Sequence, residues 1–342
     1  MQAAVLHGRE DVRVEEIPPA PLRAGEVRVA IGAALTCGTD LKVYKRGSHA
    51  RMIVPPAVFG HEFAGTISEI APGVAGWEVG DRVVAANSAP CGECFHCRHH
   101  QENLCDDLLF LNGAYAESIV VPARIVKKNL LRLQPGTAFP HAALTEPLAC
   151  VVQGWADLKA EPGQRALIIG SGPIGLMFVT LARHDQCHIA LAGRGPRLAL
   201  GQSLGASDII EISPDASLHA AVTTANVGPF DLVIEAVGKP ETWEAAVRLV
   251  RKGGKVNFFG GCPAGATVTL DTGLIHYSNL TLLASFHHTP RAIRRALELI
   301  ETRVINPDLF VDGAAPLREL PSLFRAMAQG NRAVKTLIQV GA

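Results

Sequence analysis

The stretch "RALIIGSGPIGLMFVTLAR", residues 165–183, combines three features in one continuous segment. A short apolar run typical of a strand leads into Gly170, Gly172 and Gly175 with the spacing G-x-G-x-x-G, and an apolar helical pattern follows. A strand that enters a helix through such glycines brings backbone N–H groups and the positive helix end to a pyrophosphate. The segment predicts a dinucleotide-binding loop that also contains Pro173 and Ile174. The alternative is an α/β domain whose glycines only make a tight turn.

Further runs of strand type follow this segment at residues 187–193, 208–212, 231–238, 255–261 and 280–286. Helical stretches such as residues 240–253 separate several of them. Together with the first strand they make six, which is the number in a complete dinucleotide-binding sheet. We therefore expect residues 148–287 to form a Rossmann domain, a doubly wound parallel sheet.

The first 150 residues have a different pattern, with short strand-like runs at 26–31, 65–70 and 81–86 separated by Pro and Gly. This pattern favours a mainly β domain. After residue 288, a helical stretch at 290–303 and a strand at 333–340 exceed what the six-stranded sheet needs. The fold class is therefore α/β, and residues 1–147 and 288–342 are expected to form the β-rich domain.

Composition excludes several classes of function. A chain of 342 residues with 48% hydrophobic and 19% charged residues predicts a globular protein of about two domains. Thirty-two basic residues balance thirty-two acidic ones, so no general field attracts nucleic acid or an anionic membrane. The first residues carry charges where a signal peptide needs an apolar core, and no apolar run is long enough to span a membrane. We expect a soluble, cytoplasmic protein with neither a nucleic-acid nor a membrane partner.

Four of the eight cysteines, Cys91, Cys94, Cys97 and Cys105, follow the spacing C-x2-C-x2-C-x7-C. Disulfides are rare in a reducing compartment, and four thiolates that converge on one ion suit a tetrahedral zinc whose coordination shell is closed. An iron–sulfur cluster also uses four thiolates, but the chain lacks the second cysteine run or the Cys-Pro of ferredoxins. The spacing therefore predicts a structural zinc, with an iron–sulfur cluster or unbound thiols as alternatives.

A second set of potential zinc ligands lies in the β-rich part, with Cys37 in "LTCGTD" and His61 and Glu62 in "FGHEFAG". Three protein ligands leave a fourth position for a substrate. Taken singly, the cysteine could be a core residue and the His-Glu pair could be ordinary surface side chains. Beside a nucleotide-binding domain, they indicate a catalytic zinc.

These motifs together resemble those of the zinc-dependent medium-chain dehydrogenase/reductase family, which includes alcohol and polyol dehydrogenases. The segment "GHEFAGTISEIAPGV", residues 60–74, is similar to the family's zinc signature, and the cysteine spacing and the downstream "GSGPIG" also match. The resemblance extends over essentially the whole chain. It implies a GroES-like catalytic domain built from both chain ends, with a Rossmann domain inserted between them.

The resemblance also implies roles for single residues. Cys37 and His61 would be catalytic zinc ligands, and Glu62 a ligand or an exchanging group. The segment "LTEPLAC" is similar to one that supplies an acidic ligand in the polyol and threonine dehydrogenase branch, which points to Glu146, with Cys150 as the sulfur alternative.

Three residues that follow Cys37 also receive roles from the resemblance. Thr39 would accept the substrate proton, and Asp40 would orient a ligand histidine. Lys42 stands where the family often has a proton-relaying histidine, which counts against a threonine dehydrogenase. The sequence does not place further pocket candidates, which are Tyr44, His49, Phe110, Phe286 and His287.

The implied activity is hydride transfer between a secondary alcohol of the polyol, sugar or cyclitol type and a nicotinamide cofactor. Zinc would polarise the alcohol oxygen, and the cofactor would supply the redox chemistry. The alternatives are a simple secondary-alcohol or threonine-type dehydrogenase that uses NAD, a zinc-free quinone-reductase-like relative, and a non-catalytic nucleotide-binding relative. We expect a homodimer or homotetramer that acts on a small-molecule alcohol or ketone.

The end of the second Rossmann strand predicts the choice of cofactor. NAD-binding domains have an acidic residue about 20 residues beyond the glycines, where it binds the adenosine ribose. Here Ala192 or Gly193 takes that position, followed by Arg194 and by Arg197 one turn later. A guanidinium can bind a 2′-phosphate through two parallel hydrogen bonds. NADP is therefore the expected cofactor, with NAD as the alternative.

Overall fold

The computed structural model describes residues 1–48, 52–213, 215–330 and 333–340. The chain divides into two compact units. Unit 1 comprises Met1–Ala149 and His288–Ala342, and unit 2 comprises Cys150–His287. The chain passes from unit 1 to unit 2 within helix α5 (Thr145–Leu158).

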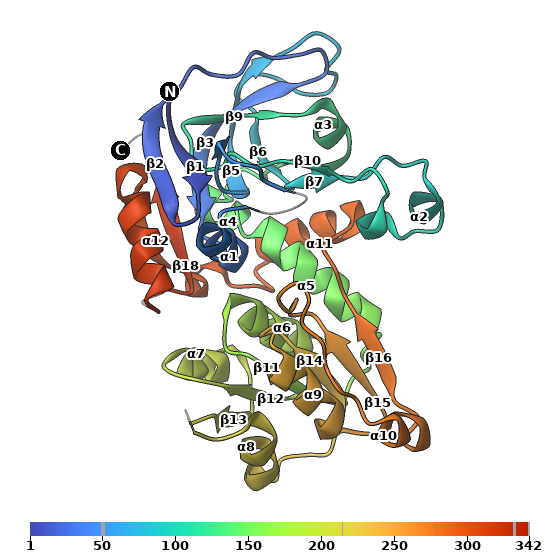
Figure 1. Cartoon of the computed structure of the whole chain (residues 1–342). Coiled ribbons are helices and arrows are strands. Elements are labelled where there is room, and N and C mark those ends of the chain that lie inside the picture. Colours follow the sequence, from blue (N-terminus) through green and yellow to red (C-terminus); the bar gives the residue numbers. More distant parts are fainter. Residues whose placement is uncertain (49–51, 214, 331–332, 341–342) are drawn as a thin grey trace. The chain divides into compact units, whose positions relative to one another are not determined.

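Unit 1 is built mainly from strands, as the sequence predicts (Figure 1). Its main sheet has the order β10-β6-β5-β3-β18-β17, and β9 also pairs with β3. These strands are β3 (Val27–Leu35), β5 (Glu62–Ile70), β6 (Arg82–Ala85), β9 (Ser118–Val121), β10 (Leu130–Arg132), β17 (Val311–Pro316) and β18 (Lys335–Gln339). Smaller sheets contain β1 (Gln2–Gly8), β2 (Asp11–Glu16) and β4 (Ala57–Val58), and β7 (Ser88–Ala89) with β8 (Leu109–Phe110).

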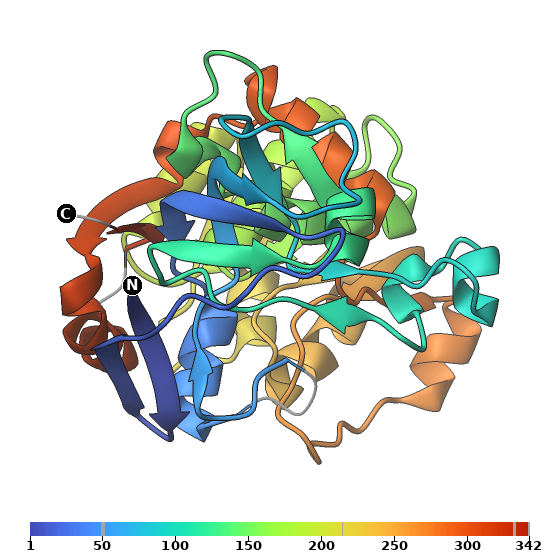
Figure 2. The same ribbon diagram turned by 90° about the horizontal axis from the view of Figure 1, so that it is seen from above.

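Short helices connect these strands. They are α1 (Gly38–Arg46), α2 (Phe95–Arg98), η1 (Glu102–Leu104), α3 (Ala123–Asn129), α4 (Phe139–Ala142), α11 (Pro290–Glu301), η2 (Pro307–Leu309), η3 (Leu317–Glu319) and α12 (Leu320–Ala328). Helix α12 lies beside the hairpin of β1 and β2 in two views (Figures 1 and 2). The core includes the fully buried Tyr115, Phe59 and Phe324, whose rings contact one another.

Strand β18, near the end of the chain, pairs next to the residues that form the site. It pairs antiparallel with β3, with Leu337 opposite Leu35 and Ile338 opposite Ala34. Just beyond the end of β3, Thr36 N–H donates to the Thr336 carbonyl at 3.0 Å. The chain's C-terminal segment is thereby held next to the residues that precede Cys37.

Unit 2 contains one six-stranded sheet, and all of its paired strands are parallel. The order is β13-β12-β11-β14-β15-β16, which is the order of a Rossmann sheet. Its elements are β11 (Arg165–Ile169), α6 (Pro173–His184), β12 (His188–Gly193), α7 (Arg197–Leu204), β13 (Asp208–Glu211), α8 (Leu218–Ala225), β14 (Phe230–Glu235), α9 (Pro240–Leu249), β15 (Val250–Phe258), α10 (Thr272–Tyr277) and β16 (Thr281–Ala284). The predicted fold class is confirmed.

One local prediction was wrong. Residues 240–253 were expected to be helical throughout, but α9 ends at Leu249 and β15 already begins at Val250. The apolar positions suit a helix as far as Leu249. Beyond it, Phe230 and Leu232 of β14 pair with Val250 and Lys255 across a shift in register, so tertiary pairing overrides the local pattern.

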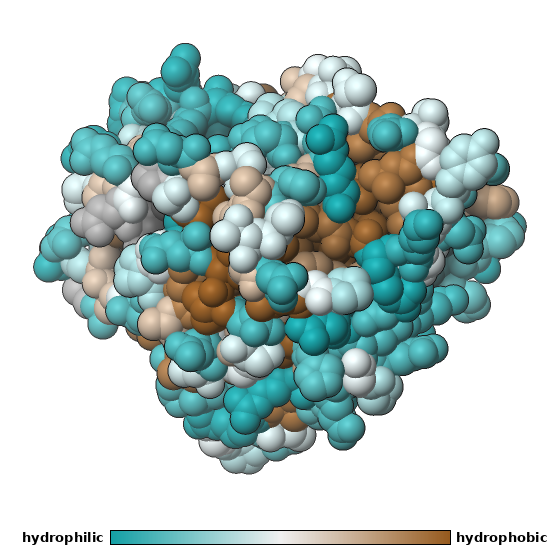
Figure 3. Space-filling view, turned by 90° about the horizontal axis from the view of Figure 1, so that it is seen from below, coloured by the Kyte–Doolittle hydropathy of each residue, from teal (hydrophilic) through white to brown (hydrophobic). Residues whose placement is uncertain are grey.

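In the described part of the chain, no helix is both long and apolar enough to cross a membrane. On the face seen from below, hydrophilic residues alternate with separate hydrophobic areas (Figure 3). Among the residues that the structure describes, the large hydrophobic side chains with more than a third of their surface exposed are Val54, Val79, Phe95, Leu104, Val237, Tyr277, Phe286 and Leu309.

Candidate active site

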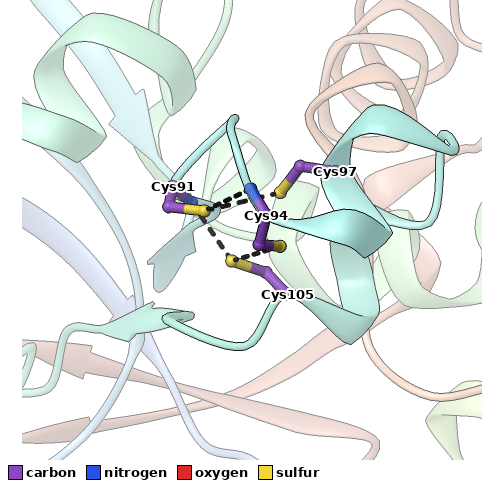
Figure 4. A group of neighbouring side chains, drawn as sticks. All are labelled: Cys91, Cys94, Cys97 and Cys105. Atoms are coloured by element: carbon purple, nitrogen blue, oxygen red, sulfur yellow. Dashed lines mark hydrogen bonds between the residues drawn. The ribbon is translucent and has the colours of Figure 1, made fainter.

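The four predicted cysteines converge in one loop of unit 1 (Figure 4). Their four Sγ atoms all lie within 4.8 Å of one another. The strands β7 and β8 pair on either side of the loop, and Gly92 adopts a φ of +93°, which allows the chain to turn back. Backbone N–H groups point at the sulfurs, with Cys91 N–H donating to Cys105 Sγ at 3.2 Å and Gly92 N–H to Cys97 Sγ at 3.3 Å.

The dimensions of this group fit a zinc ion. Two Sγ–Sγ distances, Cys91 to Cys97 and Cys94 to Cys105, are both 3.9 Å. Four sulfurs about 2.3 Å from a central zinc would be about 3.8 Å apart in a tetrahedron. The backbone N–H groups of Glu93 and Cys94 lower the pKa of Cys91 to about 6, which favours a thiolate ligand, whereas burial raises the pKa of Cys97 to about 12 and also that of Cys105. Binding of a zinc ion would therefore release protons from the two buried thiols. The loop therefore has the donor set and the spacing of a closed zinc site.

Cys37 lies at the start of α1. Its extended backbone precedes the helix, and its Sγ accepts a hydrogen bond from Thr39 N–H at 3.4 Å. The helix ends at Arg46, and the next residue, Gly47, has a φ of +89°, which gives the left-handed turn common at helix ends. Thr39 is half-buried in the first turn, whereas Lys42 is exposed. The helix start thus fixes the sulfur against the backbone of Thr39, the predicted proton acceptor.

His61 precedes β5 and is held by a buried hydrogen-bond network. Its Nδ1 lies 2.9 Å from Asp40 Oδ1, as the sequence predicted for an orienting acid. The Tyr115 hydroxyl donates to Asp40 Oδ2 at 2.6 Å and is also 3.0 Å from the Leu35 carbonyl. This network engages Nδ1 of the ring and leaves Nε2 as the donor atom for a metal.

Glu62 lies next to His61 and is completely buried. Its two carboxylate oxygens accept hydrogen bonds from Lys335 Nζ at 2.7 and 2.5 Å, and the same ammonium donates to the Thr36 carbonyl at 3.1 Å. The ligand atoms of Cys37, His61 and Glu62 lie within 4.8 Å of one another, so the structure brings the predicted group together. Direct binding of Glu62 to a metal would compete with its bond to Lys335.

Glu146 is buried in the first turn of α5. It is not part of the Cys37 group, but burial raises its pKa to about 7, with the charge of His61 opposing the shift and that of Glu62 adding to it. Its Oε1 lies 3.8 Å from Nε2 of His288, which is itself 3.0 Å from Asn87 Oδ1. Glu146 is therefore within electrostatic reach of the group. Cys150 lies four residues along the same helix.

The charges around His61 provide a test of whether the group suits a metal ion. Burial alone would lower the pKa of His61, but Asp40 and Cys37 outweigh it and raise the pKa well above its usual value. The field that favours a proton on this ring equally favours a metal cation among the same donors. A sulfur, an imidazole and a carboxylate are also ligands that zinc accepts. The residues present therefore fit a catalytic zinc.

The predicted glycine loop joins β11 to α6 in unit 2. Gly172 precedes the helix with an extended backbone, and Pro173 and Ile174 begin the first turn. A Cβ on Gly175 would lie 1.8 Å from the Gly170 carbonyl oxygen, so only glycine allows this close packing. A Cβ on Gly172 would meet nothing within 4 Å, which leaves the backbone open to a ligand. The loop fits a bound pyrophosphate.

Comparison with known proteins places both units in one family. Residues 23–130 match the family model of the alcohol dehydrogenase GroES-like domain, and residues 173–302 match that of zinc-binding dehydrogenases. The chain is 33% identical to D-altritol 5-dehydrogenase of Agrobacterium fabrum over 90% of each chain. The chain belongs to the zinc-binding alcohol dehydrogenase family.

Two further members of the zinc-binding alcohol dehydrogenase family extend the likeness to the whole chain. Sorbitol dehydrogenase of Bacillus subtilis is 28% identical over 99% of this chain and 97% of its own length. A zinc-binding dehydrogenase of Sinorhizobium meliloti, solved with bound NADP, is 28% identical over 99% of this chain and 98% of its own, with a TM-score of 0.85. Family membership confirms the predicted enzyme class, with zinc and a nicotinamide nucleotide as its cofactors.

In this zinc-binding alcohol dehydrogenase, the sequence did not reveal two polar partners of the predicted ligands. Lys335 binds Glu62, and Tyr115 binds Asp40. Lys335 begins β18 and Tyr115 lies in the segment before β9, and neither has a spacing that marks it, so only the tertiary fold identifies these residues. Among the pocket candidates, Tyr44 is buried against the Phe324 ring, and His49 lies outside the described residues.

Proposed function

We propose that this protein transfers a hydride between a secondary alcohol of the polyol, sugar or cyclitol type and NADP. The observation that carries the proposal is the group of the half-buried Cys37 with the buried His61 and Glu62, whose His61 and Glu62 bind Asp40 and Lys335. The named relatives, a sorbitol and an altritol dehydrogenase, support the substrate class. Unit 1 would be the catalytic domain and unit 2 the dinucleotide-binding domain.

Two zinc ions would have separate tasks. The loop of Cys91, Cys94, Cys97 and Cys105 would hold a structural zinc, because four thiolates leave no position for a substrate. Cys37, His61 and Glu146 would hold the catalytic zinc. Glu62 would remain bound to Lys335 and exchange with a ligand position only when that ion pair opens.

When bound, the catalytic zinc would lower the pKa of the alcohol oxygen and the nicotinamide would accept the hydride. The protein's own residues orient the reactants and move the proton. Asp40 keeps the His61 ring in one orientation, and the Thr39 hydroxyl accepts the substrate proton. Lys42 is exposed and stands where a relaying histidine would be, so water takes the proton onward from Thr39.

The preference for NADP rests on the turn after β12. The strand ends at Gly193, and the exposed Arg194 follows directly. Arg197 begins α7. No carboxylate at Gly193 repels a 2′-phosphate, and two guanidinium groups are near enough in sequence to bind it.

Three measurements test the proposal. Metal analysis is expected to find two zinc ions per chain, and a panel of polyols, sugars, cyclitols and short alcohols is expected to reveal a secondary alcohol that reduces NADP. Replacing Arg194 with Ala should lower kcat/KM for NADP about ten- to a hundredfold and change that for NAD little. A wild-type preference for NAD that Arg194→Ala leaves unchanged would contradict the cofactor assignment, and a zinc-free active enzyme would contradict the metal assignment.

A further inference from the structure

Ser171, between the first two glycines of the loop, connects that loop to Arg194. Its Oγ donates to the Arg194 carbonyl at 3.1 Å and accepts from Arg194 N–H at 3.3 Å. The serine is buried, with 9% of its surface exposed. One hydroxyl therefore binds both backbone polar groups of the arginine that follows β12.

This contact occurs where the sheet ends. Ala192 and Gly193 are still fixed by backbone hydrogen bonds, with Gly170 N–H donating to the Ala192 carbonyl and Ile212 N–H to the Gly193 carbonyl, both at 2.8 Å. Arg194 is the first residue beyond these bonds, and its side chain is exposed. Because the backbone of Arg194 is already fixed, this residue loses less conformational freedom when its side chain binds a ligand, and binding costs less entropy.

The same contact explains the glycine at position 193. A Cβ on Gly193 would lie 2.6 Å from Ser171 Oγ and 2.7 Å from Ser171 Cβ. A side chain there, including the acidic one that binds the ribose in NAD-dependent domains, would have to displace Ser171. Ser171 thus holds an arginine in place and keeps the position before it free of a carboxylate.

We propose that Ser171 is a positioning residue that sets the preference for a 2′-phosphorylated adenine nucleotide by fixing the backbone of Arg194. The inference rests on the proposed use of NADP and extends it from the arginine to the glycine loop. The loop that receives the pyrophosphate and the turn that receives the 2′-phosphate are thereby joined through one hydroxyl group.

The test compares the binding of 2′,5′-ADP and 5′-AMP, measured by calorimetry, because these nucleotides differ at the 2′-phosphate and need no turnover. The wild type is expected to bind 2′,5′-ADP about ten- to a hundredfold more tightly. Ser171→Ala should weaken 2′,5′-ADP about tenfold and 5′-AMP no more than about twofold. Ser207→Ala is the matched control, since Ser207 Oγ donates to the Ile189 carbonyl at 3.1 Å, near the other end of β12, and should leave both affinities unchanged.

A double variant identifies the route of the effect. If Ser171 acts through Arg194, adding Ser171→Ala to Arg194→Ala should not reduce the preference further. An equal loss for both nucleotides in Ser171→Ala, or an undiminished preference for 2′,5′-ADP, would overturn the role of Ser171 while leaving the use of NADP intact. A wild type that binds both nucleotides equally would instead overturn the proposed use of NADP.

Discussion

The two groups of candidate metal ligands in unit 1 are built in opposite ways. The cysteine loop takes all four sulfurs from 15 consecutive residues, and backbone N–H groups of the same loop surround them. The group around Cys37 takes its residues from distant segments, with His61 and Asp40 21 positions apart and Glu62 and Lys335 273 positions apart. Two of the loop's four cysteines are partly exposed, whereas His61, Glu62, Asp40 and Lys335 are all buried.

This difference predicts that the two groups respond differently to substitution. A local loop can lose its metal and unfold while the rest of the unit keeps its core, because few other elements depend on it. A buried group of charges has no such independence, since each charge left without its partner destabilises the interior. Four substitutions distinguish the two groups.

The largest effect is expected from Cys37→Ser. Loss of the thiolate should remove one zinc per chain and lower kcat/KM about a thousandfold, because polarisation of the alcohol oxygen supplies several kcal/mol of transition-state stabilisation. The thermal midpoint should change little. Cys187→Ser in unit 2 serves as the control for thiol loss. Full zinc content with near-normal turnover would show that Cys37 is not a ligand.

Lys335→Met should have the largest effect on stability. It leaves the carboxylate of Glu62 buried without its cation, and breaking a buried pair in this way costs about 3–5 kcal/mol. Urea unfolding of the metal-free protein measures the loss. Arg13→Met, which breaks the exposed pair with Asp11, should change the unfolding free energy far less.

A double variant separates two effects of Lys335→Met on stability, the loss of the ion pair with Glu62 and the loss of packing by the lysine side chain. Adding Glu62→Gln to Lys335→Met removes the buried negative charge and should recover part of the stability. Equal stability of the single and double variants would show that the ion pair is not the cause.

Cys94→Ser probes the cysteine loop. It should remove the other zinc and reduce the unfolding free energy by about 2–4 kcal/mol, because the binding energy of a structural metal contributes to folding. The protein that remains folded should keep its turnover per molecule. Cys262→Ser is the matched control. If Cys94→Ser instead lost turnover in proportion to its loss of zinc and kept its stability, the cysteine loop would hold the catalytic zinc and not the structural one.

The smallest effect is expected at Glu146. Replacing it with Ala should reduce retention of the catalytic zinc or turnover at least about tenfold, on the scale of losing a partner of a metal site. Glu146→Gln keeps the size of the side chain and separates charge from packing. Unchanged zinc content together with unchanged turnover would make Glu146 a structural residue.

Prediction from the sequence succeeded where the determining interactions are local. The strand, glycine loop and helix at residues 165–183 and the spacing of the four cysteines are local patterns, and the structure reproduces both. The end of α9 was missed because pairing of β15 with β14 decides it. Lys335 and Tyr115 were missed because tertiary contacts, not a local pattern, bring them to Glu62 and Asp40.

The pairing of β18 with β3 has a consequence for the biosynthesis of this protein. The ribosome makes Glu62 early, whereas its cation follows 273 residues later. Until then, a nascent chain cannot bury this carboxylate as an ion pair, and the sheet next to Cys37 lacks a strand. The cysteine loop and the flanking pair of β7 and β8 need only residues 88–110, which leave the ribosome much earlier. A truncated chain can thus contain the complete cysteine loop while the catalytic group is still incomplete. Only chains translated at least as far as β18 can become active.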